Sequence, residues 1–177
     1  MNLRLIKRSG AFLLAALVLL GIAGCSGQGD IQIGNKTLPR DSENLALCLS
    51  EIQDLSPIRG FQKATKVSLC NNALTDLSAL KGMEQIVNLD VSQNKIEDIS
   101  VLETLPQLKI LNLAGNRISD LKPLAKLTSV ESINLSNNPV EEIGALAGMK
   151  NLTVAELSHS KISVSFAVGR ADGLRSL

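Results

Sequence analysis

The sequence predicts a solenoid, a fold in which short coils of chain stack along one axis. Asparagines recur with a 22-residue period, at Asn72, Asn94, Asn116 and Asn138, and self-similarity at a fixed period is typical of repeat folds. The apolar residues are also almost entirely aliphatic, because the chain has no Trp, no Tyr and only three Phe. Aliphatic side chains suit thin stacked layers better than one thick core, and 177 residues suffice for one such domain.

Apolar residues keep fixed distances from each asparagine. The residues five before it are Val67, Leu89, Leu111 and Ile133. The residues three before it are Leu69, Val91, Leu113 and Leu135. The residues two after it are Leu74, Ile96, Ile118 and Val140, and the residues five after it are Leu77, Ile99, Leu121 and Ile143. The residues eight after it are Leu80, Leu102, Leu124 and Leu146. Apolar residues two apart face the same side of a strand. A short strand therefore precedes each asparagine, and the later residues line the far side of each coil.

The pattern LxxLxLxxN followed by xIxDIxxLxxL resembles the leucine-rich repeat, and in its 22-residue form it is similar to the internalin-like class. The resemblance implies an α/β fold: a right-handed leucine-rich-repeat solenoid with a parallel β-sheet on the concave face and short 3₁₀ or extended segments on the convex face. It also implies that the concave face binds a partner. The repeat length agrees, because one period is too short for a strand, a full helix and two turns.

Weaker copies extend the pattern at both ends. Leu45, Leu47 and Ser50 match upstream, and Leu157 and Ser160 match downstream. We therefore expect about six coils over residues 42–165, with a sheet about 30 Å wide at about 4.8 Å per strand, and a degenerate C-terminal cap over residues 166–177. An amide side chain can donate and accept at once, so we expect each asparagine to join its own turn to the next and to have no binding role.

Residues 1–24 are typical of a secretory signal peptide. Arg4, Lys7 and Arg8 precede an apolar run over positions 11–22, which is too short to span a bilayer comfortably. Without this segment the net charge falls from +1 to −2. Nucleic acid is therefore not an expected partner, because phosphate binding needs a basic surface.

The end of this segment, Ile22-Ala23-Gly24-Cys25, resembles the bacterial lipoprotein signal. The resemblance implies that a lipid is attached to Cys25, that cleavage follows Gly24, and that the protein is anchored to a membrane of the bacterial cell envelope. Ser26 in the next place favours the outer membrane if the cell is Gram-negative. The alternative is an ordinary secretion signal with an incidental cysteine. Two or more acyl chains would give stable anchoring.

Residues 25–41 contain three glycines and Pro39 but few apolar residues, which is typical of a tether. Ile31 and Ile33 alternate within this segment, so the alternative is a short strand that caps the first coil. A solenoid needs cover over its first hydrophobic layer.

Cys48 and Cys70 are separated by one full period, and each lies two places before the reference residue of its coil. Adjacent strands bring Cα atoms to about 5 Å, within the range of a disulfide, and an address outside the cytosol permits one. The alternative is that cysteine only fills a small apolar place, because parallel strands are an awkward geometry for a bridge.

A column of carboxylates, Asp54, Asp76, Asp98, Asp120 and Glu142, suggests either calcium binding or acceptors for backbone N–H groups that open the next turn. No glycine-rich loop accompanies the column, so we favour the second interpretation and expect no metal and no cofactor. The one histidine, His159, has no evident cysteine partner. We therefore expect no enzymatic activity.

The concave face carries the candidate partner-binding residues. Its expected middle column is Ala46, Ser68, Asp90, Asn112, Asn134 and Glu156, flanked by Lys66, Asn88, Lys109, Ser132 and Glu131. Of these, we expect Asp90, Asn112, Asn134 and Glu156 to contact a protein or peptide. The face has no aromatic side chain as an energetic centre, so we expect weak or avidity-assisted binding. The alternatives are a solvated face without a ligand, or a structural spacer that associates weakly with itself through the ends of the solenoid.

Overall fold

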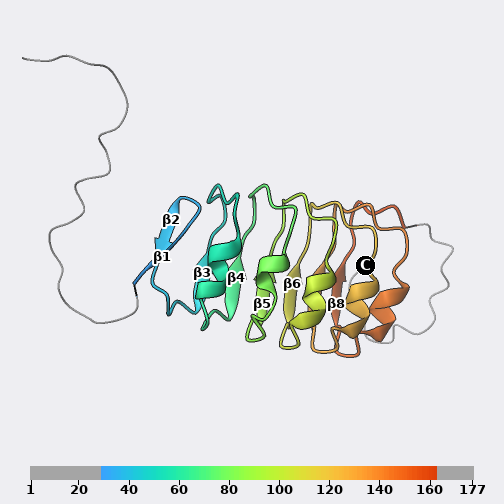
Figure 1. The fold of residues 1–177 in the computed structure, drawn as a ribbon. Coiled ribbons are helices and arrows are strands. Elements are labelled where there is room, and N and C mark those ends of the chain that lie inside the picture. The colour runs from blue at the N-terminus through green and yellow to red at the C-terminus, as the bar shows by residue number, and fades with distance from the viewer. Residues whose placement is uncertain (1–28, 163–177) are drawn as a thin grey trace, which may run out of the picture.

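The computed structural model describes residues 29–162 (Figure 1). A six-stranded parallel sheet, in the order β3-β4-β5-β6-β7-β8, runs the length of the molecule, and a separate antiparallel pair lies at its N-terminal end. The strands are β1 (Ile31–Ile33), β2 (Lys36–Leu38), β3 (Asn44–Ala46), β4 (Lys66–Ser68), β5 (Asn88–Asp90), β6 (Ile110–Asn112), β7 (Ser132–Asn134) and β8 (Val154–Glu156). The predicted solenoid of six coils is confirmed over the residues described.

Strand pairing in the large sheet follows the 22-residue period without a shift. Leu45 pairs with Val67, and Val67 in turn with Leu89. Backbone hydrogen bonds continue the pairing past the strand ends, as from Leu47 N to Ser68 O at 2.8 Å. Equivalent residues of successive coils therefore lie side by side.

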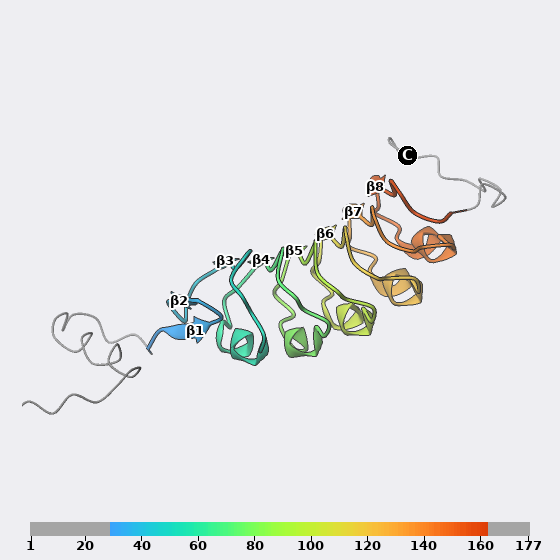
Figure 2. The same cartoon turned by 90° about the horizontal axis from the view of Figure 1, so that it is seen from above.

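Short 3₁₀ helices form the opposite side of each coil. They are η1 (Ser56–Gly60), η2 (Ser78–Leu80), η3 (Ser100–Thr104), η4 (Lys122–Lys126) and η5 (Gly144–Gly148). Figure 2 shows the sheet along the inner side of the curved solenoid and these helices along the outer side. Each helix contains an i→i+3 bond, such as that from Ile58 N to Leu55 O at 3.0 Å. The tight helix matches a repeat too short for a full α-helix.

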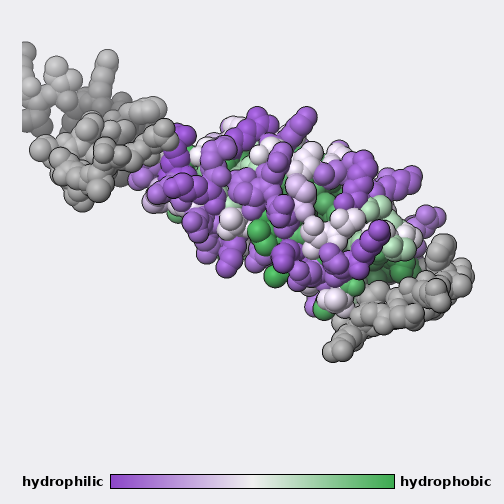
Figure 3. All heavy atoms as spheres, turned by 90° about the horizontal axis from the view of Figure 1, so that it is seen from below, coloured by the Kyte–Doolittle hydropathy of each residue, from purple (hydrophilic) through white to green (hydrophobic). Residues whose placement is uncertain are grey.

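The core is one continuous aliphatic cluster between the sheet and the 3₁₀ helices. The residues three before the reference position, Leu47, Leu69, Val91, Leu113 and Leu135, are all fully buried. In the last coils Ile143, Leu152 and Leu157 are only partly buried. Viewed from below (Figure 3), hydrophilic side chains cover most of the solenoid surface and hydrophobic ones show in small patches. Within residues 29–162, no helix is both long and apolar enough for a membrane span.

The repeated asparagines join neighbouring coils; Asn94, Asn116 and Asn138 are buried, and Asn72 is half-buried. The Nδ2 group of Asn116 donates to Leu113 O of its own coil at 2.9 Å and to Val91 O of the preceding coil at 3.0 Å. Its Oδ1 atom accepts from Ile96 N at 3.0 Å. Asn94 and Asn138 repeat these contacts. The predicted bridging role is confirmed, but each amide reaches back to the preceding coil and not forward to the next.

A β-hairpin caps the N-terminal end of the solenoid. Ile33 in β1 is 1% exposed and Ile31 is 9% exposed, and both belong to the core cluster. Gly34 turns the chain with φ of 57° and lies against Ser50 O, where a Cβ atom would lie 2.0 Å away. Within residues 29–41, the structure contains the short capping strand that was one of the two interpretations of this segment. Cys25, the predicted signal peptide and the predicted C-terminal cap over 166–177 lie outside the described residues.

Candidate functional site

The concave face of the sheet carries two columns of outward-facing side chains. One contains Asn44, Lys66, Asn88, Ile110, Ser132 and Val154, and the other contains Ala46, Ser68, Asp90, Asn112, Asn134 and Glu156. The residue between them in each strand is buried, as Leu111 is in β6. The structure thus brings the four predicted contact residues onto four successive strands in register.

Three of these contact residues also support their own backbone. Asp90 accepts a hydrogen bond from Ser92 N at 2.9 Å, and Asn134 accepts one from Ser136 N at 2.9 Å. Asn112 accepts the equivalent bond from the backbone N–H two residues on, at 3.2 Å. Because the Oδ1 atoms are engaged in this way, the second carboxylate oxygen of Asp90 and the Nδ2 group of Asn112 are the atoms left for a partner. In Asn134 the Nδ2 group already donates to the carboxylate of Glu156.

Ile110 is a candidate contact residue that was not identified from the sequence. It lies on β6 between Asn88 and Ser132 and is 49% exposed, one of two large hydrophobic side chains among residues 29–162 that are exposed. The predicted flanking residues Lys66, Asn88 and Ser132 lie in this column. Lys109, named in place of Ile110, and Glu131, named beside Ser132, do not. They precede their strands and form an ion pair with each other at 3.1 Å. The available signal was position, because Ile110 lies six residues before the reference asparagine of its coil, as Lys66 does in an earlier coil.

Cys48 and Cys70 form a disulfide, with their Cα atoms 4.5 Å apart. Each cysteine lies two residues after a member of the column that contains Ala46 and Ser68. The bond therefore joins the first coil to the second at the edge of the concave face. Both residues are half-buried. Of the two alternatives raised from the sequence, the structure contains the bond and not two unpaired apolar fillers.

The turn that follows each strand requires a left-handed backbone conformation, a feature not foreseen from the sequence. The residue just before the reference position has a positive φ in all six coils: Leu49 (53°), Asn71 (53°), Gln93 (55°), Gly115 (67°), Asn137 (57°) and His159 (58°). Asn and Gly tolerate this conformation, whereas it is unfavourable for leucine. His159 is thus a turn residue with an exposed side chain.

The carboxylate column opens the 3₁₀ helices, as favoured from the sequence. Asp54, Asp76, Asp98 and Asp120 each accept a bond from the backbone N–H two residues on, at 2.7–2.8 Å. Glu142 occupies the equivalent sequence position before η5 in the fifth coil. Within residues 29–162, no three His, Cys, Asp or Glu side chains gather closely enough to hold a metal ion.

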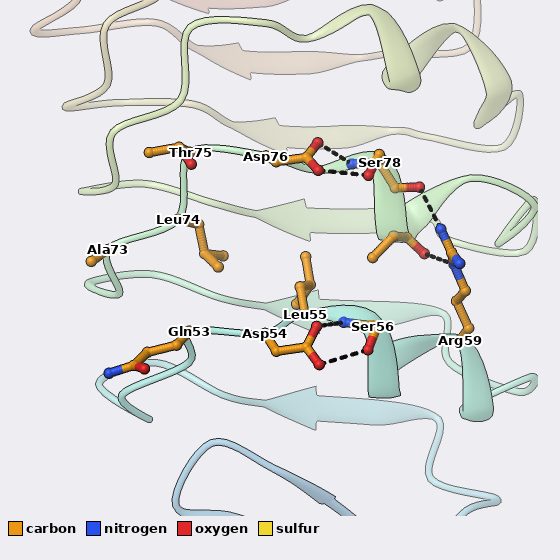
Figure 4. A pocket seen from close by; sticks show the side chains of 11 residues that line it. Gln53, Asp54, Leu55, Ser56, Arg59, Ala73, Leu74, Thr75, Asp76 and Ser78 are labelled. Carbon is orange, nitrogen blue, oxygen red and sulfur yellow. Dashed lines mark hydrogen bonds between the residues drawn. The ribbon is translucent and has the colours of Figure 1, made fainter.

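A groove of about 220 Å³ lies on the convex side between η1 and η2 (Figure 4). Its polar groups bond to one another: Asp54 with Ser56, and Asp76 with Ser78, while Arg59 donates to Ser78 O at 3.3 Å. The backbone N–H and then the hydroxyl of Ser56 lower the pKa of Asp54. The hydroxyl and the backbone N–H of Ser78, and more weakly Arg59, lower the pKa of Asp76. These carboxylates are therefore ionised and already satisfied, which is typical of a structural role.

Comparison with known proteins supports this fold directly. Residues 62–118 match a family model described as a leucine-rich repeat. Residues 106–148 match a second model, which describes two copies of leucine-rich repeats. A search of curated proteins found no match.

Three of the similar solved structures come from two bacteria. An internalin (inlF) from Listeria monocytogenes is 28% identical, with a TM-score of 0.62 over 64% of this chain and 34% of that one. Internalin C2 (inlC2) from the same organism is 32% identical, with a TM-score of 0.60 over 64% and 50% of the two chains. A leucine-rich-repeat protein from Leptospira interrogans is 24% identical, with a TM-score of 0.59 over 63% and 30%.

The aligned part of this chain covers only half of the internalin C2 structure, and a smaller share of the other two. The likeness therefore concerns the repeats, which both family models and the fold identify. Residues 62–148 match models of leucine-rich repeats, and they fold as a solenoid like that of these internalin structures.

Proposed function

We propose that this chain is a lipid-anchored protein of the bacterial envelope whose concave face binds a protein or peptide partner. Leucine-rich repeats commonly mediate protein–protein interaction. The observation that carries the proposal is Ile110, an exposed apolar side chain within an otherwise largely polar sheet face. Binding energy concentrates where a central apolar group becomes desolvated inside a polar rim, and Ile110 has that arrangement.

The polar groups around Ile110 define what would fit there. Asn88 in β5 pairs with Ile110 in β6, and Asp90 in β5 pairs with Asn112 in β6, so these three polar residues surround Ile110. With Oδ1 of Asp90 engaged by Ser92 N, its second carboxylate oxygen remains an acceptor. A partner segment that places an apolar side chain over Ile110 and a donor group over Asp90 is therefore complementary to this face.

The anchor is supported by the sequence around Cys25, which lies outside the described residues. Growth with a labelled fatty acid tests it, with Cys25→Ala as the control. We expect label in the wild-type chain and none in Cys25→Ala. A wild-type chain without label would refute the anchor.

Binding is tested in intact cells by a photo-crosslinking residue placed at Asn112, with the same residue at Ser119 on the convex side as the matched control. We expect one partner to be captured from position 112 and not from 119. Ile110→Lys should then weaken the captured interaction at least tenfold, the effect of losing a central contact worth about 1.4 kcal/mol or more. Equal capture from both positions would contradict the proposal.

A second variant tests the predicted contact residues themselves. Asp90→Arg with Asn112→Arg should abolish the interaction, whereas Ser119→Arg with Glu141→Arg changes the net charge equally on the convex side and should not. The first pair also removes the bonds to Ser92 N and Ala114 N, at roughly 1 kcal/mol each. Its circular dichroism and urea midpoint are therefore measured alongside, and Ile110→Lys, which breaks no side-chain hydrogen bond, remains the cleaner variant.

The alternative function, a spacer that assembles through its ends, is favoured by one observation. The core is less well covered near the last described coil, where Ile143, Leu152 and Leu157 are partly buried, whereas the hairpin covers the first coil. Sedimentation of the soluble form beginning at Ser26 separates the two functions. A monomer across concentrations argues against assembly, and concentration-dependent association argues for it.

A further inference from the structure

The cap hairpin fixes how many residues separate the solenoid from Cys25. Packing against the core begins at Ile31, which is 9% exposed, and continues through Ile33 at 1%. These residues cannot contribute to a tether without exposing the first hydrophobic layer. Only the five residues from Ser26 to Asp30 remain between Cys25 and the hairpin.

Five residues are a short connection. Six Cα–Cα steps join Cys25 to Ile31, and fully extended they reach about 22 Å at most. We infer that the N-terminal cap is the membrane-proximal end of this protein and lies against the headgroup surface of the bilayer. The inference rests on the proposed acylation of Cys25, because only a lipid at that residue brings the bilayer so close.

The hairpin also sets the side of the first coil on which the anchor lies. A Cβ atom at Gly60 would lie 2.3 Å from Cδ1 of Ile31, so the start of β1 packs directly on the end of η1. From there β1 runs toward Ser50, where Gly34 makes its turn. The 3₁₀ helices form the outer side of the solenoid and the sheet its inner side (Figure 2). The chain therefore enters on the convex side, and the concave face remains open.

The exposed surface of the cap suits a hydrated headgroup layer and not insertion into lipid. Gln32, Thr37 and Arg40 are exposed, and the apolar residues of β1 face the core. Five strand spacings of about 4.8 Å place β8 about 24 Å from β3 along the sheet. The concave face therefore begins at the membrane-proximal end of the solenoid, and a partner of Ile110 must approach the membrane surface to within a few tens of ångströms.

Photo-crosslinking from the lipid tests this orientation on the full acylated chain. The purified protein is placed in vesicles of phosphatidylethanolamine and phosphatidylglycerol that contain a lipid with a photoreactive headgroup, and the labelled peptides are mapped by mass spectrometry. We expect severalfold more label in residues 31–60 than in residues 132–156. Uniform labelling, or more label in residues 132–156, would overturn the inference.

A tether variant supplies the control. Inserting about 20 Gly and Ser residues between Gly29 and Asp30 adds a flexible coil, so labelling of residues 31–60 should fall severalfold. Unchanged labelling would show that tether length does not set the orientation and would overturn the inference. Fatty-acid incorporation is measured on the same samples. A chain without fatty acid refutes the anchor and this inference with it, whereas an acylated chain with uniform label refutes the inference alone.

Discussion

The interior coils and the first coil satisfy their buried backbone groups in different ways. In an interior coil, a buried asparagine such as Asn116 bonds to the backbone of its own coil and of the coil before it. The first coil has Ser50 in that place, and its hydroxyl reaches only Cys48 O within its own turn, at 3.2 Å. Like the interior coils, it is held by the amide of the next coil, here Asn72, and the disulfide and the hairpin hold it in addition.

The difference shows what a repeat requires from its neighbours. An interior coil has a coil on each side, so one amide per coil can satisfy the buried backbone groups of the whole stack. The first coil has a neighbour on one side only, and its other side needs added cover. The cap and the disulfide are therefore features of the chain end and not of the repeat.

The largest expected effect comes from removing one interior amide. Asn116→Ala removes the bonds that Nδ2 donates to Val91 O and Leu113 O and the bond that Oδ1 accepts from Ile96 N. Each loss leaves a buried backbone group unpaired at roughly 1–3 kcal/mol, so the free energy of unfolding should fall by about 4 kcal/mol, whereas Ser50→Ala loses one bond and should cost about 1 kcal/mol. Urea denaturation measures both. Equal losses in the two variants would remove the distinction between the coils.

Next comes the disulfide, which belongs to the N-terminal end of the stack. Replacing Cys48 and Cys70 with serine opens the loop closed by a sequence separation of 22, and the expected loss is about 3 kcal/mol. Hydrogen exchange should locate it: Leu47 N and Leu49 N, which bond to the second coil, should lose protection. Leu113 N in an interior coil should keep its protection. Uniform loss along the stack would mean that the coils unfold as one unit and that the bond is not local.

A smaller effect, in the stabilising direction, is expected at the turn of the first coil. Leu49 is 71% exposed and has φ of 53°, a conformation that asparagine adopts at the equivalent Asn71. Leu49→Asn should therefore raise the free energy of unfolding by roughly 1 kcal/mol. The control is Gly115→Ala, where a Cβ atom would lie 2.4 Å from the Gln93 side chain and φ is 67°. Thermal unfolding should move in opposite directions for the two variants.

The smallest effect is a pH dependence at the convex carboxylates. The hydroxyl and the backbone N–H of Ser78, with Arg59, lower the pKa of Asp76 in the folded chain. The unfolded chain then binds the proton more readily, so this contribution to stability is complete above the unfolded pKa of about 3.9. It is lost as the pH falls through the folded value. The urea midpoint should thus decline below about pH 4. An NMR titration in which Ser78→Ala fails to raise the pKa of Asp76 would contradict this cause.

The regular coils were predictable because each position repeats. Leu113, Asn116 and Asp120 recur with the same chemistry in successive copies, so their burial, amide bonding and turn opening could be inferred from spacing and elementary hydrogen-bond needs. The contact column of Asp90 and Asn112 followed from the same register.

The features that were missed or left open are those that the repeat does not fix. Ile110 is an exposed apolar residue in a largely polar column, and Leu49 occupies a left-handed turn that suits asparagine or glycine better. In both cases the residue type does not reveal the exposed position that the side chain takes. The disulfide depends on the local approach of Cys48 and Cys70, and the hairpin depends on contacts with the end of the stack. Such details require coordinates, because spacing alone allows both alternatives.

The unshifted strand register has a consequence for how this molecule can change in length. The central strand residues stand opposite one another at intervals of one whole coil, as Leu89 does with Leu111 and Leu111 with Ile133. Duplicating or deleting one whole interior repeat therefore leaves every surviving amide, aliphatic layer and helix opening with a matching neighbour, while any other length disrupts all three. The concave face can thus grow or shrink in steps of one strand, and its reach can vary while the architecture stays constant.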